Sequence, residues 1–194
     1  MIRALKLIFI PAQEWEKIAN SNVNYWKVIF LFLLPLMALA SAVDGYCLVH
    51  FGQKVGEFGL IRRVAQDLAI RYEGAYLGLT LVSILLGARF IQTVCVSFHV
   101  PANFLLCFAT IAYGMSPILL AHMLDGIPIV NTWICWAIGI AVSWSILYHG
   151  VALMLKPEQT KGFGLYIFSI VFLLVLSGLT HFIALQVLEG RLAA

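Results

Sequence analysis

Charged residues are scarce in this sequence, and their scarcity narrows the class of protein. Asp, Glu, Lys and Arg make up 11% of the 194 residues, whereas apolar residues make up 62%. A water-soluble domain of this length cannot bury so much apolar surface. The basic residues flank apolar runs and the net charge is only +3. This pattern fits orientation in a membrane and argues against nucleic-acid binding.

Motifs that carry chemistry are missing as well. The sequence contains no GxxxxGK[ST] phosphate-binding loop, no GxGxxG, no HExxH and no GxSxG. Its four cysteines lie inside apolar runs and show no CxxC spacing. They therefore indicate neither a zinc motif nor a disulfide framework, and we interpret them as small apolar packing residues. We predict no enzymatic activity, no catalytic residue and no cofactor.

What the sequence has instead is a series of long apolar runs. At ~1.5 Å per residue, each is long enough to cross a ~30 Å hydrocarbon core as a helix. Five spans are predicted, over residues 28–50, 74–98, 103–124, 128–155 and 163–187. The second-to-third and third-to-fourth connections are very short, so those helices must be antiparallel neighbours. The predicted fold class is all-α: a polytopic membrane protein, with a five-transmembrane-helix bundle and interfacial amphipathic helices.

Two further segments have amphipathic patterns. The N-terminal segment, residues 1–27, precedes the five-helix domain of residues 28–194 and predicts two short interfacial helices. The second of them opens at Pro11, which suits a first helical turn. The apolar side of the first contains Ile2, Leu5, Ile8 and Phe9. Another amphipathic helix is predicted over Phe58 to Tyr72, where apolar residues repeat at helical spacing.

Basic residues are distributed almost evenly between the two sides of the predicted bundle. Six fall on the side of the N-terminus: Arg3, Lys6, Lys17, Lys27, Lys156 and Lys161. Five fall on the other side: Lys54, Arg62, Arg63, Arg71 and Arg191. The positive-inside rule then predicts an N-terminus on the inner, cytoplasmic side.

Several fragments follow one another along the chain: IPAQEWEKIA, LLPLMAL, AYGMSPILLAHMLDGIP and LYHGVALMLKPEQTKGFGLY. Together they resemble the Yip family of Ypt/Rab-interacting membrane proteins, in its prokaryotic branch. The resemblance covers nearly the whole chain, in the same order and with the same five spans. The matching residues are Pro11, Trp15, Pro35, Tyr113, Pro117, Pro128, Gly150, Met154, Pro157 and Lys161.

The resemblance carries its own implications. It implies a multi-pass protein of a prokaryotic inner membrane. Eukaryotic relatives have a long cytosolic region before the first span, where this chain has a short helix pair, so a Rab-type GTPase partner is not implied. His99, Val100 and Pro101 replace the glycine pair that is usual in the family before the third span.

Two prolines punctuate the third span and the turn after it. Pro117 has no N–H, so the carbonyl of Tyr113 loses its helical partner and the helix should kink. We interpret the kink as a packing feature, with a hinge or a cavity wall as the alternative. The stretch Asp125-Gly126-Ile127-Pro128 predicts a tight turn, in which Gly126 tolerates a positive φ and Pro128 opens the next helix.

Four polar residues fall at a similar depth, in the outer third of the predicted bundle: Asp44, His122, Asp125 and His181. Carboxylates and imidazoles that face one another can bind a metal ion or relay protons. The alternative is four unrelated interfacial residues. Arg89 lies roughly 16 Å in depth from Asp44, beyond side-chain reach. We therefore predict that Arg89 does not pair with Asp44 and extends to the inner headgroups.

The fourth span carries small residues at successive i+4 positions, at Ala137, Ala141 and Ser145, followed by His149. Such spacing lets helices approach closely. We favour internal packing for this stripe, with a homo-oligomer face as the alternative. His149 ends the stripe.

These features predict a non-catalytic membrane scaffold or adaptor. Its partners are the lipid bilayer, which it crosses, and an unidentified membrane protein or lipid that it organises. The alternative is a transport component for a small solute, ion or lipid, built around the kinked third helix. A continuous polar cavity would favour transport, and a solid apolar core would favour the scaffold.

Overall fold

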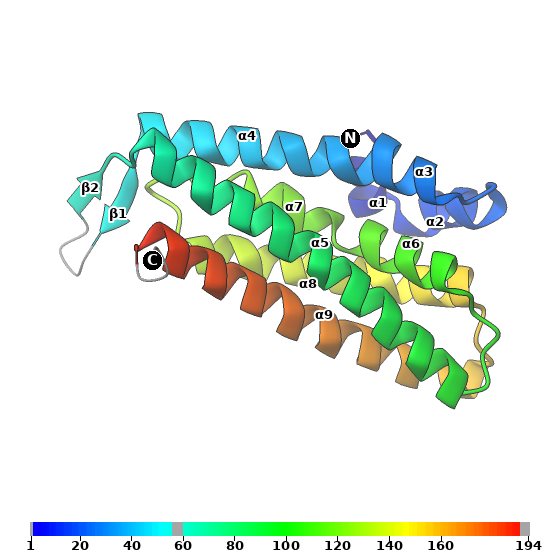
Figure 1. Ribbon diagram of the computed structural model, residues 1–194. Helices are drawn as coiled ribbons and strands as arrows, with labels where there is room; N and C mark the ends of the chain where they lie inside the picture. Colours follow the sequence, from blue (N-terminus) through cyan, green and yellow to red (C-terminus); the bar gives the residue numbers. More distant parts are fainter. Residues whose placement is uncertain (1, 56–59, 191–194) are drawn as a thin grey trace.

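The computed structural model describes residues 2–55 and 60–190 and shows a bundle of long helices (Figure 1). Met1, residues 56–59 and residues 191–194, which include Arg191 of the charge count, lie outside the described part. Within that part, five helices are long and apolar enough to cross a membrane: Tyr25–His50, Gln66–Ser97, Phe104–His122, Thr132–Leu155 and Thr160–Leu188. The predicted all-α, five-span membrane bundle is confirmed.

The elements follow one another without long loops. Two short helices come first, α1 (Ile2–Phe9) and α2 (Pro11–Asn20). The first crossing consists of α3 (Tyr25–Val28), the π-helix η1 (Ile29–Leu33) and α4 (Leu34–His50), and the second is α5 (Gln66–Ser97). The third consists of α6 (Phe104–Gly114) and α7 (Ser116–His122). The fourth consists of α8 (Thr132–Gly150) and the π-helix η2 (Val151–Leu155), and the fifth is α9 (Gln159–Leu188). A two-stranded antiparallel hairpin, β1 (Gln53–Val55) and β2 (Leu60–Arg62), links α4 to α5.

The third crossing occupies the centre of the bundle. The protein buries 78% of its most apolar window, against 39% to 50% for the other four. Helix α6 packs on α5 and α8, and α7 packs on α4 and α8. The remaining crossings surround it, and α9 lies along α5 (Figure 1). The short helices α1 and α2 lie at one end of the bundle, whereas the hairpin lies at the other end (Figure 1).

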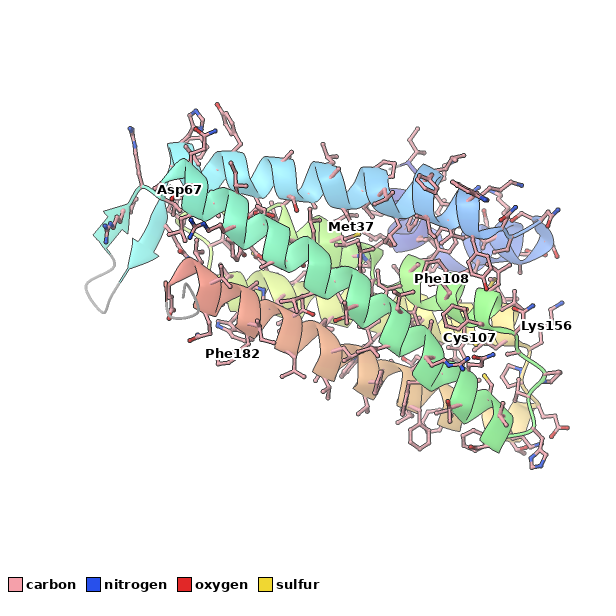
Figure 2. The ribbon with its side chains drawn as sticks, in the orientation of Figure 1. Met37, Asp67, Cys107, Phe108, Lys156 and Phe182 are labelled. Carbon is pink, nitrogen blue, oxygen red and sulfur yellow. The ribbon has the colours of Figure 1, made fainter. Side chains whose placement is uncertain are left out.

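Charged side chains occupy the two ends of the molecule, and apolar side chains cover the surface between them. Asp67 lies at the hairpin end and Lys156 at the opposite end, and Phe182 projects outward from α9 (Figure 2). The side chain of Phe182 is half exposed. An apolar outer surface between polar ends is the arrangement that a lipid bilayer requires.

The kink predicted at Pro117 takes the form of a complete break. Helix α6 ends at Gly114 and α7 begins at Ser116. The hydroxyl of Ser116 donates a hydrogen bond of 2.7 Å to the carbonyl oxygen of Tyr113, the group that loses its backbone partner to Pro117. A local side chain therefore satisfies the carbonyl inside the apolar core.

The N-terminal segment packs against the bundle in addition to presenting an apolar surface. In α1, Ala4 and Leu7 are buried, whereas Ile2 and Phe9 are exposed. In α2, Trp15 and Ile18 are completely buried. Elements α7, α8 and η2 provide the surface on which these two helices lie.

The prediction of a separate amphipathic helix over Phe58 to Tyr72 is wrong for its described part, which excludes Phe58. Its first described residues form β2, residues 63–65 connect the strand to α5, and α5 begins at Gln66 and runs without interruption into the second crossing. Gly52 adopts a φ of +81°, and a Cβ at this position would lie 2.6 Å from the carbonyl oxygen of Arg62. The glycine thus lets the two strands close, and strand pairing prevails over helical periodicity at Leu60–Arg62.

The sequence predicted that Pro128 opens the fourth crossing, but the structure does not bear this out. Helix α8 begins at Thr132, and the side chain of Asn131 caps it by accepting a hydrogen bond of 2.9 Å from the Trp133 amide. Pro128 lies in a separate turn, closed by a hydrogen bond of 3.0 Å from the amide of Val130 to the carbonyl of Ile127. A better helix cap downstream therefore fixes where this helix starts.

His99 takes over the conformation for which a glycine is usual. It has a φ of +56° directly after α5. The amide of Val100 donates to the carbonyl of Cys95 at 2.8 Å, and the amide of His99 donates to that of Val96 at 3.0 Å. This pair of bonds defines the Schellman motif, whose left-handed position favours glycine.

Replacing His99 with glycine is therefore expected to stabilise the protein. A non-glycine residue in the left-handed region costs roughly 1–2 kcal/mol, so H99G should raise the free energy of unfolding by about 1 kcal/mol in detergent micelles. The matched control is S97G, which places glycine in the right-handed last turn of α5 and should lower stability. A loss of stability in H99G would contradict the assignment of this motif.

Candidate functional site

Five ionisable residues from four crossings and one turn meet at the hairpin end of the bundle. Four of them are the predicted residues Asp44, His122, Asp125 and His181, and the fifth is Glu73. Asp44 lies near the end of α4, Glu73 in the second turn of α5, and His122 at the last position of α7. All five are buried. We call them the acidic–imidazole cluster.

His122 is the centre of the cluster. Its Nδ1 lies 2.9 Å from Oδ2 of Asp125, within hydrogen-bond distance. Its Nε2 lies 3.4 Å from Oε2 of Glu73 and 3.8 Å from Oδ2 of Asp44. The ring stacks on Tyr76 with a centroid separation of 3.6 Å and an interplanar angle of 17°. These contacts fix both the position and the plane of the imidazole.

The hydrogen bond to Asp125 fixes which way the imidazole ring of His122 is oriented. A carboxylate three residues away accepts the Nδ1 proton of His122, which leaves Nε2 directed at the other two carboxylates. Histidines that bind metals use this arrangement, because the second hydrogen bond sets the tautomer and the orientation of the ligand nitrogen. Asp125 is therefore a positioning residue for His122.

His181 lies at the edge of the cluster. Its Nδ1 is 4.0 Å from Oδ2 of Asp125, too far for a hydrogen bond. Trp133 meets its ring edge-on at a centroid distance of 4.8 Å. Its Nε2 has no hydrogen-bond partner among the described residues. His181 thus belongs to the cluster by position but does not bond to its centre.

Several buried oxygen atoms of the cluster lack a hydrogen-bond partner within the described part of the chain. They are both carboxylate oxygens of Asp44, Oε1 of Glu73 and Oδ1 of Asp125. Asp44 is 0% exposed and Glu73 is 7% exposed. Unpaired buried carboxylates are costly. Three carboxylates against two imidazoles therefore require protons or a bound cation for electrical balance.

Gly126 allows the cluster to close. A Cβ at this position would lie 2.6 Å from Cβ of Cys47 and 2.7 Å from the backbone oxygen of Asp44. The turn after α7 can therefore lie directly on α4, which brings His122 next to Asp44. Gly126 does not have the positive φ predicted for it, so close approach is the reason for glycine here.

Glu73 is the member of the cluster that the sequence analysis missed, because the predicted second span began one residue later, at Gly74. The sequence contains a signal that points to it. Ala69, Tyr72, Glu73, Tyr76 and Thr80 follow helical spacing and form the buried stripe of α5. An acidic residue inside an otherwise buried stripe marks a functional candidate in a membrane helix.

A groove of about 590 Å³ between α4 and α5 reaches the cluster from outside. Glu73 and Ser41 line its inner part, and Tyr46, His50 and Gln66 are also among its lining residues. Gly45 faces Glu73 across it, with an ideal Cβ 3.4 Å from Cγ of Glu73. Of the five cluster residues, Glu73 is the one that lines this groove.

At the opposite end, Tyr113 and Gly150 meet at Trp15. The indole of Trp15 packs edge-on against the Tyr113 ring, with 5.9 Å between ring centroids. A Cβ on Gly150 would lie 2.6 Å from the indole. Arg3 donates to the Tyr113 hydroxyl at 3.3 Å and pairs with Glu14 at 3.4 Å. Three residues that carry the family resemblance thus form one contact, which fixes α1 and α2 to the bundle.

The remaining predicted residues lie apart from both groups. Arg89 is exposed on α5, where it donates a hydrogen bond of 2.7 Å to Gln92. Asp44 pairs with His122 and not with Arg89. Pro117 is buried at the break between α6 and α7. His149 is half-buried and lines a groove of about 760 Å³ at the α2 end of the bundle, together with Tyr148 and Phe163.

The internal packing favoured for the small-residue stripe on α8 is wrong. Ala137, Ala141 and Ser145 are exposed. Gly139 makes the close internal contact, because a Cβ there would lie 2.9 Å from Cα of Ile118 on α7. The buried face of α8 includes Cys135, Gly139 and Ser143, each two positions before a residue of the predicted stripe.

Comparison with known proteins identifies one family. The family model described as Yip1 domain matches residues 5–180, which is nearly the whole chain. The searches of curated proteins and of solved structures found no match.

Proposed function

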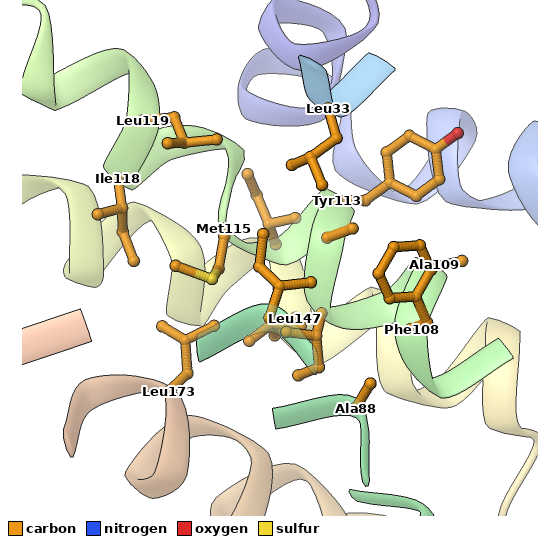
Figure 3. Packing of buried hydrophobic residues seen from close by; sticks show 14 of the residues in the cluster. Leu33, Ala88, Phe108, Ala109, Tyr113, Met115, Ile118, Leu119, Leu147 and Leu173 are labelled. Carbon is orange, nitrogen blue, oxygen red and sulfur yellow. The ribbon is translucent and has the colours of Figure 1, made fainter. Parts of the chain in front are cut away.

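Because this chain belongs to the Yip1 domain family, we propose that it is a non-catalytic membrane scaffold or adaptor that organises membrane partners or lipids. The observation that supports this proposal is the filled centre of the bundle. All five crossings contribute apolar side chains to one continuous cluster, among them Leu33, Ala88, Ile118, Leu147 and Leu173 (Figure 3). A packed apolar centre suits a protein that presents surfaces, because close apolar packing does not provide a pathway for ions or polar solutes.

The break in the third crossing is packed as well, which speaks against the transport alternative. A Cβ on Gly114 would lie 2.5 Å from Cδ2 of Leu147, and a Cβ on Gly139 would lie 2.9 Å from Cα of Ile118. Met115, the residue between the two helices, is buried in the apolar cluster. A conducting hinge needs a cavity beside its unwound segment, whereas α8 fills this place.

A flux measurement separates the two functions. Purified protein in liposomes that contain the pH-sensitive dye pyranine is expected to leave the rates of proton and K⁺ leakage at those of protein-free vesicles. A protein-dependent flux that follows the amount of protein would contradict the scaffold and favour transport. L147A, which opens space beside the break, serves as the matched variant and should also stay impermeable if α8 is only a packing partner.

Orientation and location belong to the same proposal. The end that carries α1 and α2 contains Arg3, Lys6, Lys17, Lys27, Lys156 and Lys161, and the positive-inside rule assigns this end to the cytoplasm. A prokaryotic inner membrane follows from the family branch that the fragments resemble. Labelling of N22C but not of Q53C from the cytoplasmic side would support this orientation.

The exposed face of α8 is a suitable surface for a second copy of the chain. Ala137, Ala141 and Ser145 are exposed along it, and small residues allow close helix contact. Oxidation of A141C in membranes is expected to give a covalent dimer. L85C, at a half-exposed position on α5, is the control and should remain monomeric. Equal yields from both variants would contradict a homo-oligomer through this face.

A further inference from the structure

We propose that Asp44, Glu73 and His122 bind one divalent transition-metal ion, with Asp125 as the residue that positions His122. This site is independent of the scaffold function, since a scaffold needs no metal. The three residues offer one ligand atom each, and these atoms all lie within 4.8 Å of one another. Each comes from a different crossing, so an ion here would link α4, α5 and α7.

The distances between ligand atoms fit a shared ion. Nε2 of His122 lies 3.4 Å from Oε2 of Glu73 and 3.8 Å from Oδ2 of Asp44. Zinc and similar ions lie about 2.0–2.2 Å from nitrogen and oxygen ligands, which separates neighbouring ligand atoms by about 3–3.5 Å. All three ligand atoms lie within 4.8 Å of one another, so the carboxylates of Asp44 and Glu73 would move inward on binding the ion.

The same distances fit a direct ion pair poorly. Charge-assisted hydrogen bonds between nitrogen and a carboxylate oxygen are about 2.7–2.9 Å long. The contacts from Nε2 of His122 to Glu73 and Asp44 exceed this length by 0.5 Å or more, whereas the Nδ1 contact to Asp125 is 2.9 Å. Nδ1 therefore makes a short hydrogen bond, whereas Nε2 makes only a long hydrogen bond of 3.4 Å to Glu73 and faces Asp44 at 3.8 Å, separations close to those between metal ligands.

The unpartnered oxygen atoms point to the same conclusion. Neither carboxylate oxygen of Asp44 has a hydrogen-bond partner among the described residues, and Oε1 of Glu73 has none. Asp44 is 0% exposed, so water does not compensate its charge. A divalent cation between the two carboxylates removes this cost, because it supplies the positive charge that the cluster lacks.

The donor set selects the class of metal. One imidazole nitrogen with two carboxylate oxygens suits Zn²⁺ or Mn²⁺ better than Mg²⁺ or Ca²⁺, which prefer oxygen ligands alone. The groove between α4 and α5 provides an entry path, because Glu73 lines it. The ion would reach the site from the hairpin end without crossing the bundle.

The test uses the full chain, purified without a histidine tag, stripped with EDTA and dialysed in detergent. Isothermal titration with ZnCl₂ and MnCl₂ is expected to show one ion per chain, and Zn²⁺ should raise the thermal midpoint by several degrees. CoCl₂ should give a visible d–d absorption spectrum. These measurements on the wild-type protein do not depend on the folding of any variant.

Three variants test the ligands and their support. D44N and E73Q preserve side-chain shape and should each weaken Zn²⁺ binding by at least tenfold. D125N removes the acceptor that orients His122 and should weaken it 10- to 100-fold while changing the Co²⁺ spectrum. H149Q is the control, since His149 lies at the opposite end of the bundle and lines a different groove.

Three results would overturn the proposal. The first is a stripped wild-type protein that binds no Zn²⁺, Mn²⁺ or Co²⁺ above a detergent blank. The second is unchanged affinity in D44N, E73Q and D125N, and the third is a loss in H149Q equal to theirs, which would show binding outside the cluster. Because flux and cross-linking test the scaffold separately, failure here leaves that function unaffected, and the converse also holds.

Discussion

H122A is expected to lower the free energy of unfolding by about 3–5 kcal/mol. The substitution removes the only side chain that contacts Asp44, Glu73 and Asp125 together among the described residues. Three buried carboxylates then lose their common partner, and Tyr76 loses the ring on which it stacks. Reversible unfolding in mixed micelles of SDS and a mild detergent, followed by circular dichroism, measures the change.

H149A is the matched control for this prediction. His149 is a half-buried histidine at the opposite end of the bundle, and a substitution outside the core that breaks no buried polar network usually changes stability by less than about 0.5 kcal/mol. Equal, small effects of H122A and H149A would mean that the cluster is well solvated and contributes little to the fold.

W15A is expected to release α1 and α2 from the bundle. Trp15 is completely buried, and truncation of a buried aromatic residue costs about 3–5 kcal/mol. Since 1.4 kcal/mol corresponds to a factor of ten, hydrogen exchange of the amides in α1 and α2 should accelerate by roughly 10²–10⁴. The five crossings should keep their protection, because Trp15 contacts them only at one end.

Controls for W15A separate docking from lipid contact. Trp26 is 67% exposed near the start of the first crossing, so W26A should leave exchange in α1 and α2 unchanged. G150A approaches the same contact from the other side, since its Cβ would lie 2.6 Å from the Trp15 ring. It should also accelerate exchange, although alanine normally stabilises a helix.

The comparison for G150A is G78A on α5, where a new Cβ meets nothing within 4 Å. G78A should stabilise by up to about 1 kcal/mol, as helix propensity alone predicts. Identical behaviour of G150A and G78A would contradict the close packing of Trp15 on Gly150.

The crossings could be predicted from the sequence because lipid imposes a strong and local constraint. A run of about 20 apolar residues has few alternatives to a spanning helix. The break at Pro117 followed from the missing N–H, which is equally local. The helix boundaries did not follow, because hairpin pairing at Gly52 and capping by Asn131 depend on partners outside each apolar run.

The sequence predicted the membrane depth of the cluster residues but not which of them contact one another. Helical rise placed Asp44, His122, Asp125 and His181 at one level, and the structure joins them at that level. Which way each side chain faces depends on the rotation of each helix, which its neighbours set. For the same reason, Glu73 was missed and the stripe on α8 was assigned to the wrong side.

The central claim is that side chains from separate crossings form one buried unit around His122. A double-mutant cycle with D44N and H122Q in the unfolding assay tests it most directly. Residues in contact should show a coupling free energy of about 1 kcal/mol or more. If the two effects add to within about 0.5 kcal/mol, as for residues more than ~10 Å apart, Asp44 and His122 do not meet and the cluster does not exist.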